Sequence, residues 1–476
     1  MPFDLVAAAR REMIERGFEP DMPEAAARQA RELQPGRPDG LEDLSALLWS
    51  SIDNDESRDL DQVEWAERVA GGIRVLVGIA DVDVLVARNT PIDAHASRET
   101  TTVYTGVRVF PMLPERLSTD LTSLGENEPR AAIVIEMVVN AEGDIASSAV
   151  RRALVRNRAQ LTYSATGPWL EGTASPPAKV AAAAELEAQL KLQDEAAHAL
   201  REARHRKGAL SFDRQETQAV VENGHVKSIE ARRANRASRL IEDFMIGANE
   251  VMAQTLRAAG VTSIRRVVKA PERWQRIRDL AERYGSKLPP EPDAQALNEF
   301  LVERKRSDAG HYADVSLAVL KLMGPGVYVA ARAGGEQAGH FGLAALDYTH
   351  STAPNRRFAD LVTQRLLKAF LAKRPAAYSD DELDEIARDC TLMEDAARKV
   401  QRDMAKRIAA VAVQDRVGQQ FAAVVTGVTP KGVFVRVADP PVEGRLMRHA
   451  EGLDVGDRVR VTLIATDPER GFIDFA

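Results

Sequence analysis

The spacing of hydrophobic residues changes twice along the chain, and each of the three parts has a pattern typical of a different structure. Before residue 49, apolar residues recur at helical spacing, as at Leu5, Ala8 and Met13. This spacing predicts a small helical region over residues 1–48. Its size and pattern are compatible with a helix-turn-helix arrangement.

From Trp49 onward, short runs rich in Val and Ile alternate with turn residues, as in ALLWSSID, IRVLVGIADVDVLV and AAIVIEMVVN. Runs of this kind predict β-strands. Long stretches of helix-forming residues follow, one of them after the proline pair at 176–177 and another over 380–413. We therefore expect a large α+β domain over residues 49–413, with mixed sheets surrounded by helices.

The C-terminal part has a third pattern. Short strand-like runs, FAAVVTGVTPKGVFVRV, VEGRLM, DRVRVTLIAT and GFIDF, are separated by glycine and proline turns. This pattern is typical of a small closed β-barrel. Residues 414–476 are therefore predicted to form an all-β barrel of the OB type, which gives a multidomain α+β chain.

Charge changes this picture in one region. The formal net charge of the 476-residue chain is −7, which by itself argues against a nucleic-acid partner. Residues 201–280, however, hold 17 lysines and arginines against 10 acidic residues, a balance of +7. A locally basic tract can bind a polyanion, although solvated helix faces would account for it equally well.

Cysteine content and hydropathy exclude several classes of protein. Cys390 is the one cysteine of the chain, which excludes an intramolecular disulfide framework and a cysteine-built zinc site. No stretch approaches the roughly 20 apolar residues of a membrane span. The first residues carry acids and arginines where a secretory signal needs an apolar core. We expect a cytoplasmic protein with no membrane partner.

The strongest candidate for chemistry is the acidic segment SIDNDESRDLDQVEWAE. Its four aspartates, Asp53, Asp55, Asp59 and Asp61, lie within nine residues and repel one another unless they are solvated or share a cation. Their oxygen atoms suit Mg²⁺, Mn²⁺ or Ca²⁺ better than zinc.

Three interpretations of this segment compete. The first is a solvated acidic loop. The second is an EF-hand, since acidic or hydroxyl residues stand at most ligand positions counted from Asp53, including Glu64 at position 12; however, Arg58 occupies the sixth position, which requires glycine. The third is a phosphodiesterase site in which metal ions activate water and stabilise the leaving oxygen.

The downstream sequence favours the third interpretation. The spacing of Asp53, Asp59 and Asp61 resembles the catalytic signature of the ribonuclease II family, also called RNB. The segments GIADVDVLV, TTVYTGVRVFPMLPERLSTDLTSL, AQLTY, KGALSF, SRLIEDFMIGANEVMA and GHFGLAALDYTHSTAPNRRFADLVTQRL follow in the order of that family. The resemblance covers roughly residues 49–410. It identifies the segment 49–413 as a catalytic domain of this family.

The resemblance implies a processive hydrolytic 3′→5′ exoribonuclease that degrades single-stranded RNA to nucleoside 5′-monophosphates. It implies that Asp53, Asp59 and Asp61 bind Mg²⁺, with Mn²⁺ as a possible substitute, and that Asp61, Asp59 and Arg356 are catalytic. The family usually has a second aspartate directly after Asp61, where this chain has Gln62. Gln62 would bind the metal through an uncharged carbonyl oxygen, so the protein could instead be an RNA-binding protein with weak or lost nuclease activity.

The resemblance also implies which residues contact RNA. Tyr104 and Phe212 match the aromatic residues that stack on the terminal bases, and Tyr163 matches a tyrosine near the chemistry. Glu242, with its neighbour in LIEDFM, matches acids that face the RNA channel, and Arg357 lies beside the catalytic arginine in STAPNRRFADL.

The C-terminal barrel resembles an S1 RNA-binding domain, in which Phe421 and Phe434 are candidate stacking residues. Residues 415–476 carry 8 basic against 9 acidic side chains, so this barrel cannot bind RNA mainly by charge. Larger family members carry two cold-shock barrels before the catalytic domain, whereas helices are expected here. The chain is expected to act as a monomer on single-stranded RNA.

Overall fold

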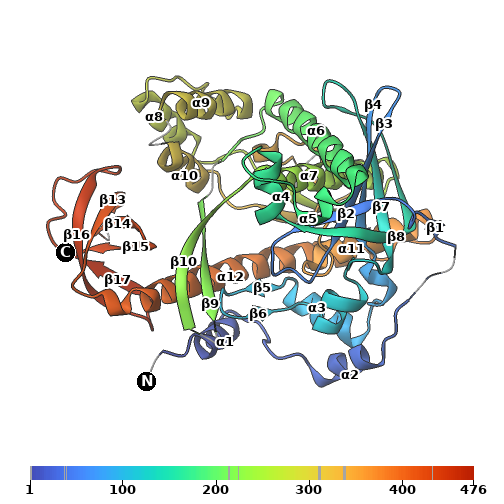
Figure 1. Cartoon of the computed structure of the whole chain (residues 1–476), viewed down its shortest axis with the longest axis horizontal. Coiled ribbons are helices and arrows are strands. Elements are labelled where there is room, and N and C mark those ends of the chain that lie inside the picture. Colours follow the sequence, from blue (N-terminus) through green and yellow to red (C-terminus); the bar gives the residue numbers. More distant parts are fainter. Residues whose placement is uncertain are drawn as a thin grey trace.

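The computed structural model describes residues 3–36, 38, 40–212, 215–222, 225–308, 312–335, 339–430 and 432–476. These residues form a large α+β body and a closed β-barrel, joined by a long helix (Figure 1). The predicted α+β fold class is therefore confirmed. None of the helices in these ranges is long and apolar enough to span a bilayer.

The body is built around a six-stranded sheet with the order β1-β8-β2-β3-β4-β7. Because β8 also pairs with β7, the sheet curls back on itself. Nearly all of β4 is buried, as expected for an apolar strand that is covered on both faces. The strands are β1 (Glu42–Asp43), β2 (Trp49–Asp53), β3 (Gln62–Val69), β4 (Gly72–Ala80), β7 (Pro129–Val139) and β8 (Ile145–Thr162).

Two long helices, α6 and α7, pack against each other and against strands of this sheet. The helix predicted after the proline pair is broken near its start, into α5 and α6. Helices α8, α9 and α10 share a separate hydrophobic cluster. The helices of this part are α3 (Pro91–Glu99), α4 (Tyr163–Leu170), α5 (Ala178–Ala181), α6 (Ala184–Arg206), α7 (Arg236–Ala258), α8 (Trp274–Arg283), α9 (Ala294–Ser307), α10 (Tyr312–Leu322) and α11 (Phe358–Leu371).

Three pairs of short strands lie outside the six-stranded sheet and the barrel. Each pair is antiparallel, and the first carries Tyr104 at the end of its first strand. The pairs are β5 (Val103–Tyr104) with β6 (Val109–Phe110), β9 (Gln215–Glu222) with β10 (His225–Arg233), and β11 (Ser263–Val267) with β12 (Val327–Ala331).

Helix α12 (Asp380–Ala412) runs along the body and ends at the barrel (Figure 1). The barrel closes in the order β13-β14-β15-β17-β16, which confirms the five-stranded barrel expected from the sequence. Its hydrophobic core also contains Ala410 and Val413 from the end of α12 and the residue after it. The strands are β13 (Gln420–Thr429), β14 (Gly432–Ala438), β15 (Pro441–Leu446), β16 (Arg458–Asp467) and β17 (Phe472–Phe475).

The N-terminal residues form two helices that pack on the body. Helix α1 (Leu5–Glu15) buries the apolar stripe expected from its spacing and packs on α12, while α2 (Glu24–Glu32) packs on α3. In α1, Glu12 is buried and forms an ion pair with Arg407 of α12. These contacts attach the N-terminal helices to the same body that carries the acidic segment.

Glu99, at the end of α3, provides a test of this attachment. Its Oε1 accepts a hydrogen bond from the Glu19 amide at 2.9 Å, and burial raises the pKa of its carboxyl from 4.5 to about 7. The folded state therefore retains a proton that the unfolded chain releases, so this group's stabilising contribution is complete below pH 4.5 and is lost as the pH rises through 7.

We expect Glu99→Gln to raise the melting temperature at pH 8, because the amide retains an acceptor without carrying a charge. At pH 5 the effect should be small, since the wild-type carboxyl is then protonated. Scanning calorimetry of both proteins at the two pH values measures the difference. An identical change at both pH values would contradict this account.

Candidate functional site

The acidic segment forms the connection between β2 and β3. Asp53 ends β2, and its Oδ1 accepts a hydrogen bond from the Asn54 amide at 2.7 Å. Strand β8 runs parallel to β2 and pairs Thr162 with Asp53, so Tyr163 follows at the same edge of the sheet. Because β2 and β8 are parallel neighbours that end at the same edge of the sheet, they bring the two predicted site residues Asp53 and Tyr163 close together.

A segment after the π-helical turn Leu117–Leu121 holds the second half of this connection. Ser123 donates a hydrogen bond to the Arg58 carbonyl at 2.7 Å and accepts one from the Leu60 amide at 3.1 Å. The Ala80 amide on β4 bonds to the Asp61 carbonyl at 2.9 Å. The backbone around Asp59 and Asp61 is thus fixed by groups that the sequence did not single out.

Asp61 lies at the centre of the arrangement and is 1% exposed. Its Oδ1 accepts a hydrogen bond from the Asn355 amide at 3.1 Å, and its Oδ2 lies 3.5 Å from Nε of Arg356. Burial raises the pKa of the Asp61 carboxyl to about 7, and the nearby Arg356 guanidinium opposes that shift. The structure therefore brings together the two residues that were predicted to be catalytic.

Asn355 is a residue of this site that sequence reasoning did not identify. It follows Pro354 in the loop of residues 351–357 that precedes α11, the arginine loop, and its Oδ1 accepts a hydrogen bond from Thr122 at 2.6 Å. Its Nδ2 is buried and has no hydrogen-bond partner among the described residues. Asn355 thus joins the arginine loop to the segment that holds the acidic connection.

The two adjacent arginines have different surroundings. The Arg356 side chain is 47% exposed, whereas Arg357 forms a bidentate pair with Asp360 through contacts of 2.9 and 2.7 Å. Asp360 also accepts the Ala353 amide at 2.8 Å. The Arg357 guanidinium therefore holds the loop through Asp360. Its predicted contact with RNA stays a prediction.

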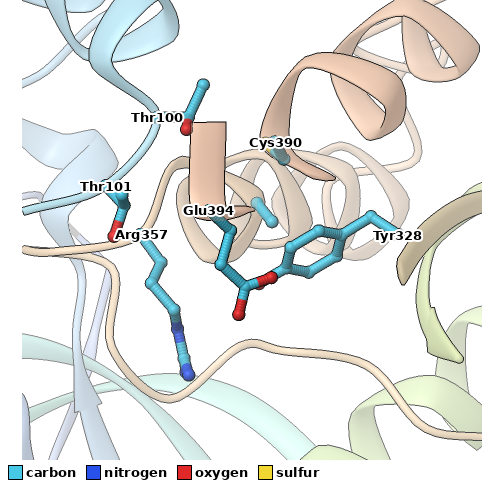
Figure 2. Close-up of a pocket in the computed structure, with 7 residues that line it drawn as sticks. Thr100, Thr101, Tyr328, Arg357, Cys390 and Glu394 are labelled. Atoms are coloured by element: carbon cyan, nitrogen blue, oxygen red, sulfur yellow. The ribbon is translucent and has the colours of Figure 1, made fainter. Parts of the chain in front are cut away.

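A small cavity of about 50 Å³ is lined by Arg357 on one side and by residues of α12 on the other (Figure 2). Its volume is far below the roughly 300 Å³ of a small-molecule site, so it has room for water and not for a nucleotide. It is lined by Thr100, Thr101, Tyr328, Arg357, Ala359, Cys390 and Glu394.

Tyr104 faces the acidic segment from the β5–β6 pair. Its hydroxyl donates a hydrogen bond to Asp59 at 3.2 Å, and the side chain remains 40% exposed. The preceding Thr102 amide bonds to the Arg356 carbonyl at 3.0 Å, which ties this strand to the arginine loop. Phe212 lies partly buried at the edge of the α8–α10 cluster. An exposed ring beside an arginine and aspartates suits contact with a nucleotide base.

Comparison with protein families decides the identity of the body. A family model described as the RNB domain matches residues 41–373. The chain belongs to the RNB-domain family. A second model, described as the RNase II-type exonuclease C-terminal S1 domain, matches residues 419–476, which form the barrel. The resemblance seen in the sequence motifs is therefore confirmed.

Relatives of this RNB-domain chain include Ribonuclease R of Escherichia coli, with 30% identity over 95% of this chain and 60% of the relative. Ribonuclease R 1 of Lactococcus lactis shares 30% identity over 92% of this chain and 56% of the relative. The chain thus spans little more than half the length of these relatives.

Solved structures show the same fold. RNase R of Mycoplasma genitalium, in complex with ribose methylated single-stranded RNA, superposes with a TM-score of 0.89 at 22% identity, covering 99% of this chain and 78% of that one. Yeast Ssd1, described as a pseudonuclease, has a TM-score of 0.71 at 16% identity and covers 98% of this chain and 57% of that one. Since a pseudonuclease shares the fold, activity has to be argued from the site.

The RNB domain places the two acids of LIEDFM differently. Glu242 on α7 is exposed, whereas Asp243 is 1% exposed and forms ion pairs with Arg201 and Arg204 of α6. Glu242 stays a candidate for RNA contact. The interpretation that both acids face a channel is wrong for Asp243, which neutralises two arginines inside the protein.

Several arginines of the basic tract over 201–280 likewise form ion pairs within the protein. Besides the pairs with Asp243, Arg236 bonds to Asp194, Arg257 to Asp347 and Arg266 to Glu394, at 2.6, 2.6 and 2.5 Å. Part of the positive charge of this tract is therefore matched by acids elsewhere in the fold. It does not by itself mark an RNA-binding surface.

Both histidines of the RNB-domain motifs hold local structure. His340 accepts the Leu343 amide at 3.2 Å, and His350 bonds to the Tyr328 hydroxyl at 2.7 Å. Burial lowers the pKa of His340 to about 4 and lowers that of His350 well below its usual value. Two imidazoles held neutral in this way are not suited to act as general bases near neutral pH.

In the S1 barrel, the two candidate stacking residues differ in their surroundings. Phe421 packs partly against the barrel core and lies edge-on to Phe475, with ring centroids 6.4 Å apart. Phe434 is half-buried on β14, opposite Arg445 of β15. Both stay predictions as RNA contacts, and Phe434 has the surroundings that suit stacking better.

The donor set of the RNB domain fits a hard divalent cation. Oδ2 of Asp61 and both side-chain oxygens of Glu64 are buried without hydrogen-bond partners among the described residues. No three His, Cys, Asp or Glu side chains in the described part of the chain form a metal-binding group by themselves. Mg²⁺ commonly takes one or two carboxylates and completes its shell with water and phosphate oxygens, so the residues present suit such a site.

Proposed function

We propose that this protein is a processive hydrolytic 3′→5′ exoribonuclease that degrades single-stranded RNA to nucleoside 5′-monophosphates. The observation that carries the proposal is the pair formed by buried Asp61 and half-exposed Arg356, beside Asp59 and Tyr104. A carboxylate beside a guanidinium at a partly open position suits the cleavage of a phosphodiester. The complexes of Mycoplasma genitalium RNase R with single-stranded and double-stranded RNA support an RNA substrate.

We assign each side chain a role on the basis of its position. Arg356 extends accessible N–H groups that would bind the phosphate at the RNA 3′ end and offset the charge that develops on it. Tyr104 and Phe212 would hold the terminal bases, and Tyr163 would line the same edge beside Asp53. Glu242, Phe421 and Phe434 would contact RNA further along the strand.

A divalent cation would be held by Asp53, Asp59, Asp61 and Gln62, and it would supply Lewis-acid activation of the attacking water. Mg²⁺ is the cation that we propose, with Mn²⁺ as a substitute. The oxygen-only character of the donors supports this choice.

We further propose that the protein acts as a monomer in the cytoplasm. The buried thiol of Cys390 is compatible with a reducing compartment. Because the 2′-hydroxyl is what lets a protein distinguish RNA from DNA at a site, DNA of the same sequence should be a poor substrate.

A 5′-labelled oligoadenylate incubated with the protein and Mg²⁺ or Mn²⁺ tests the activity directly. The expected result is a ladder that shortens from the 3′ end to small 5′-labelled fragments, with nucleoside 5′-monophosphates as the released product. The same oligonucleotide blocked at its 3′ end should resist degradation. Release of label as a mononucleotide at the start of the reaction would contradict the proposed polarity.

A second function is favoured by one observation. Gln62 stands where the family usually has an aspartate, which removes a negative charge from the metal site. The protein would then bind RNA and cleave it weakly or not at all. In the same assay, RNA that is shifted in a gel but remains intact with both cations would favour this alternative.

A further inference from the structure

Glu64 on β3 is an unusual residue for the middle of a sheet. It pairs with Ser50 of β2 and with Val77 of β4, and it is completely buried, with 0% of its surface exposed. Neither of its carboxylate oxygens has a hydrogen-bond partner among the described residues. Burying a carboxyl group without a hydrogen-bond partner is unfavourable, so an apolar residue would stabilise this position better.

The surroundings of Glu64 are acidic. Glu64 pairs with Ser50 of β2, the strand that ends at Asp53. Burial raises the pKa of the Glu64 carboxyl well above its usual value, and the Asp53 carboxylate adds to that shift. Burial and, after it, the Asp53 and Glu64 carboxylates raise the pKa of the Tyr163 hydroxyl. Tyr163 directly follows β8 at the same edge of the sheet. No cationic side chain in the described part of the chain opposes the shift at Glu64.

Strand geometry relates Glu64 to Gln62. Side chains two residues apart in a strand lie on the same face of the sheet, and β3 pairs regularly with β4 from Gln62 to Val69. Gln62 and Glu64 therefore share one face. The chain lacks a carboxylate at Gln62, where the RNB-domain pattern has one, and has a carboxylate on the next residue of the same face.

We propose that Glu64 is a metal ligand that replaces the carboxylate missing at Gln62, and that it completes the divalent-cation site proposed for Asp53, Asp59, Asp61 and the Gln62 carbonyl. This inference rests on the proposed metal-dependent function of the same site. The Glu64 carboxylate restores the negative charge that the uncharged Gln62 carbonyl does not give to a Mg²⁺ or Mn²⁺ ion. The cation would then satisfy the two buried oxygens of Glu64.

Binding of Mn²⁺ to the full chain, measured by electron paramagnetic resonance without RNA, tests the inference independently of catalysis. We expect Glu64→Gln to weaken Mn²⁺ binding at least tenfold. The matched control is Glu67→Gln on the same strand, which lies in an ion pair with Arg74 at 2.7 Å and should bind Mn²⁺ like the wild type. An affinity of Glu64→Gln within twofold of the wild type overturns the inference.

Two further variants separate ligation from a structural role. Gln62→Asp combined with Glu64→Gln restores the carboxylate at the position usual in the family and is expected to recover Mn²⁺ binding, whereas a purely structural Glu64 predicts no recovery. Glu64→Asp keeps the charge but withdraws it by one methylene, and should weaken binding even if Glu64→Gln does not fold. Wild-type affinity in Glu64→Asp overturns the inference.

Failure of this inference is distinguishable from failure of the proposed function. If the wild type cleaves RNA with Mn²⁺ and Glu64→Gln binds the ion normally, the role of Glu64 is refuted and the nuclease stands. If the wild type neither binds Mn²⁺ nor cleaves RNA, both are refuted.

Discussion

Asp61→Asn is expected to lower kcat for RNA hydrolysis by at least about 10³-fold, which corresponds to about 4 kcal/mol of transition-state stabilisation. The amide preserves the shape of the side chain and can still accept the hydrogen bond from the Asn355 amide, but it removes the charge that faces Arg356. RNA binding should change little, because Asp61 is buried and contributes no exposed surface. Single-turnover cleavage and gel-shift titration of the same preparation measure the two effects.

The matched control is Asp55→Asn, which makes the same substitution in the same connection. Asp55 is exposed and bonds to Ser164 at 2.6 Å, so its replacement should leave kcat within about twofold. Circular dichroism should show both variants folded, since an asparagine at position 61 relieves the cost of a buried charge. Wild-type hydrolysis by Asp61→Asn would refute the role assigned to Asp61.

The second large effect is expected at Arg356. Replacing it with alanine removes a guanidinium whose N–H groups are available to a phosphate, and kcat should fall by about 10²- to 10³-fold. Arg356→Lys should recover part of the loss, because lysine restores the charge but not the planar bidentate geometry. Rapid-quench measurement of single-nucleotide release gives the rate of the chemical step for each variant.

Its neighbour provides the comparison. In Arg357→Lys, the bidentate pair with Asp360 is lost while the positive charge remains. We expect this variant to have a clearly lower melting temperature and only a small loss of kcat, since Asp360 also holds the Ala353 amide. If Arg357→Lys instead abolished cleavage and retained full stability, Arg357 would act in cleavage and would not be needed to hold the loop.

Local patterns in the sequence predicted much of the fold, because the periodicity of helices and strands depends on residues that are close together in the sequence. The helical stripe of Leu5, Ala8 and Met13 is buried as its spacing requires, and the glycine and proline turns of the C-terminal segment do separate the strands of a closed barrel. The family resemblance likewise pointed to Asp61 and Arg356, which the structure places beside each other.

Contacts between distant segments could not be predicted in the same way. The Asn355 amide donates a hydrogen bond to Asp61, which lies 294 positions away in the sequence. The spacing of apolar residues does not predict which loops come into contact. The basic tract shows the same limit: a charge count does not reveal that Arg266 is paired with Glu394 or Arg236 with Asp194. Glu64 entered the sequence interpretation only as a possible EF-hand ligand, although a charged residue among the apolar positions of a buried strand also breaks the pattern expected for such a strand.

The way in which α12 ends has a consequence for dissecting the protein. Ala410 and Val413 belong to the hydrophobic core of the barrel, although they precede its first strand. A truncation placed directly before that strand would therefore remove part of the barrel's interior together with the linker. The two parts should melt in one cooperative transition, and an isolated barrel that is meant to fold alone needs the last turns of the helix as its base.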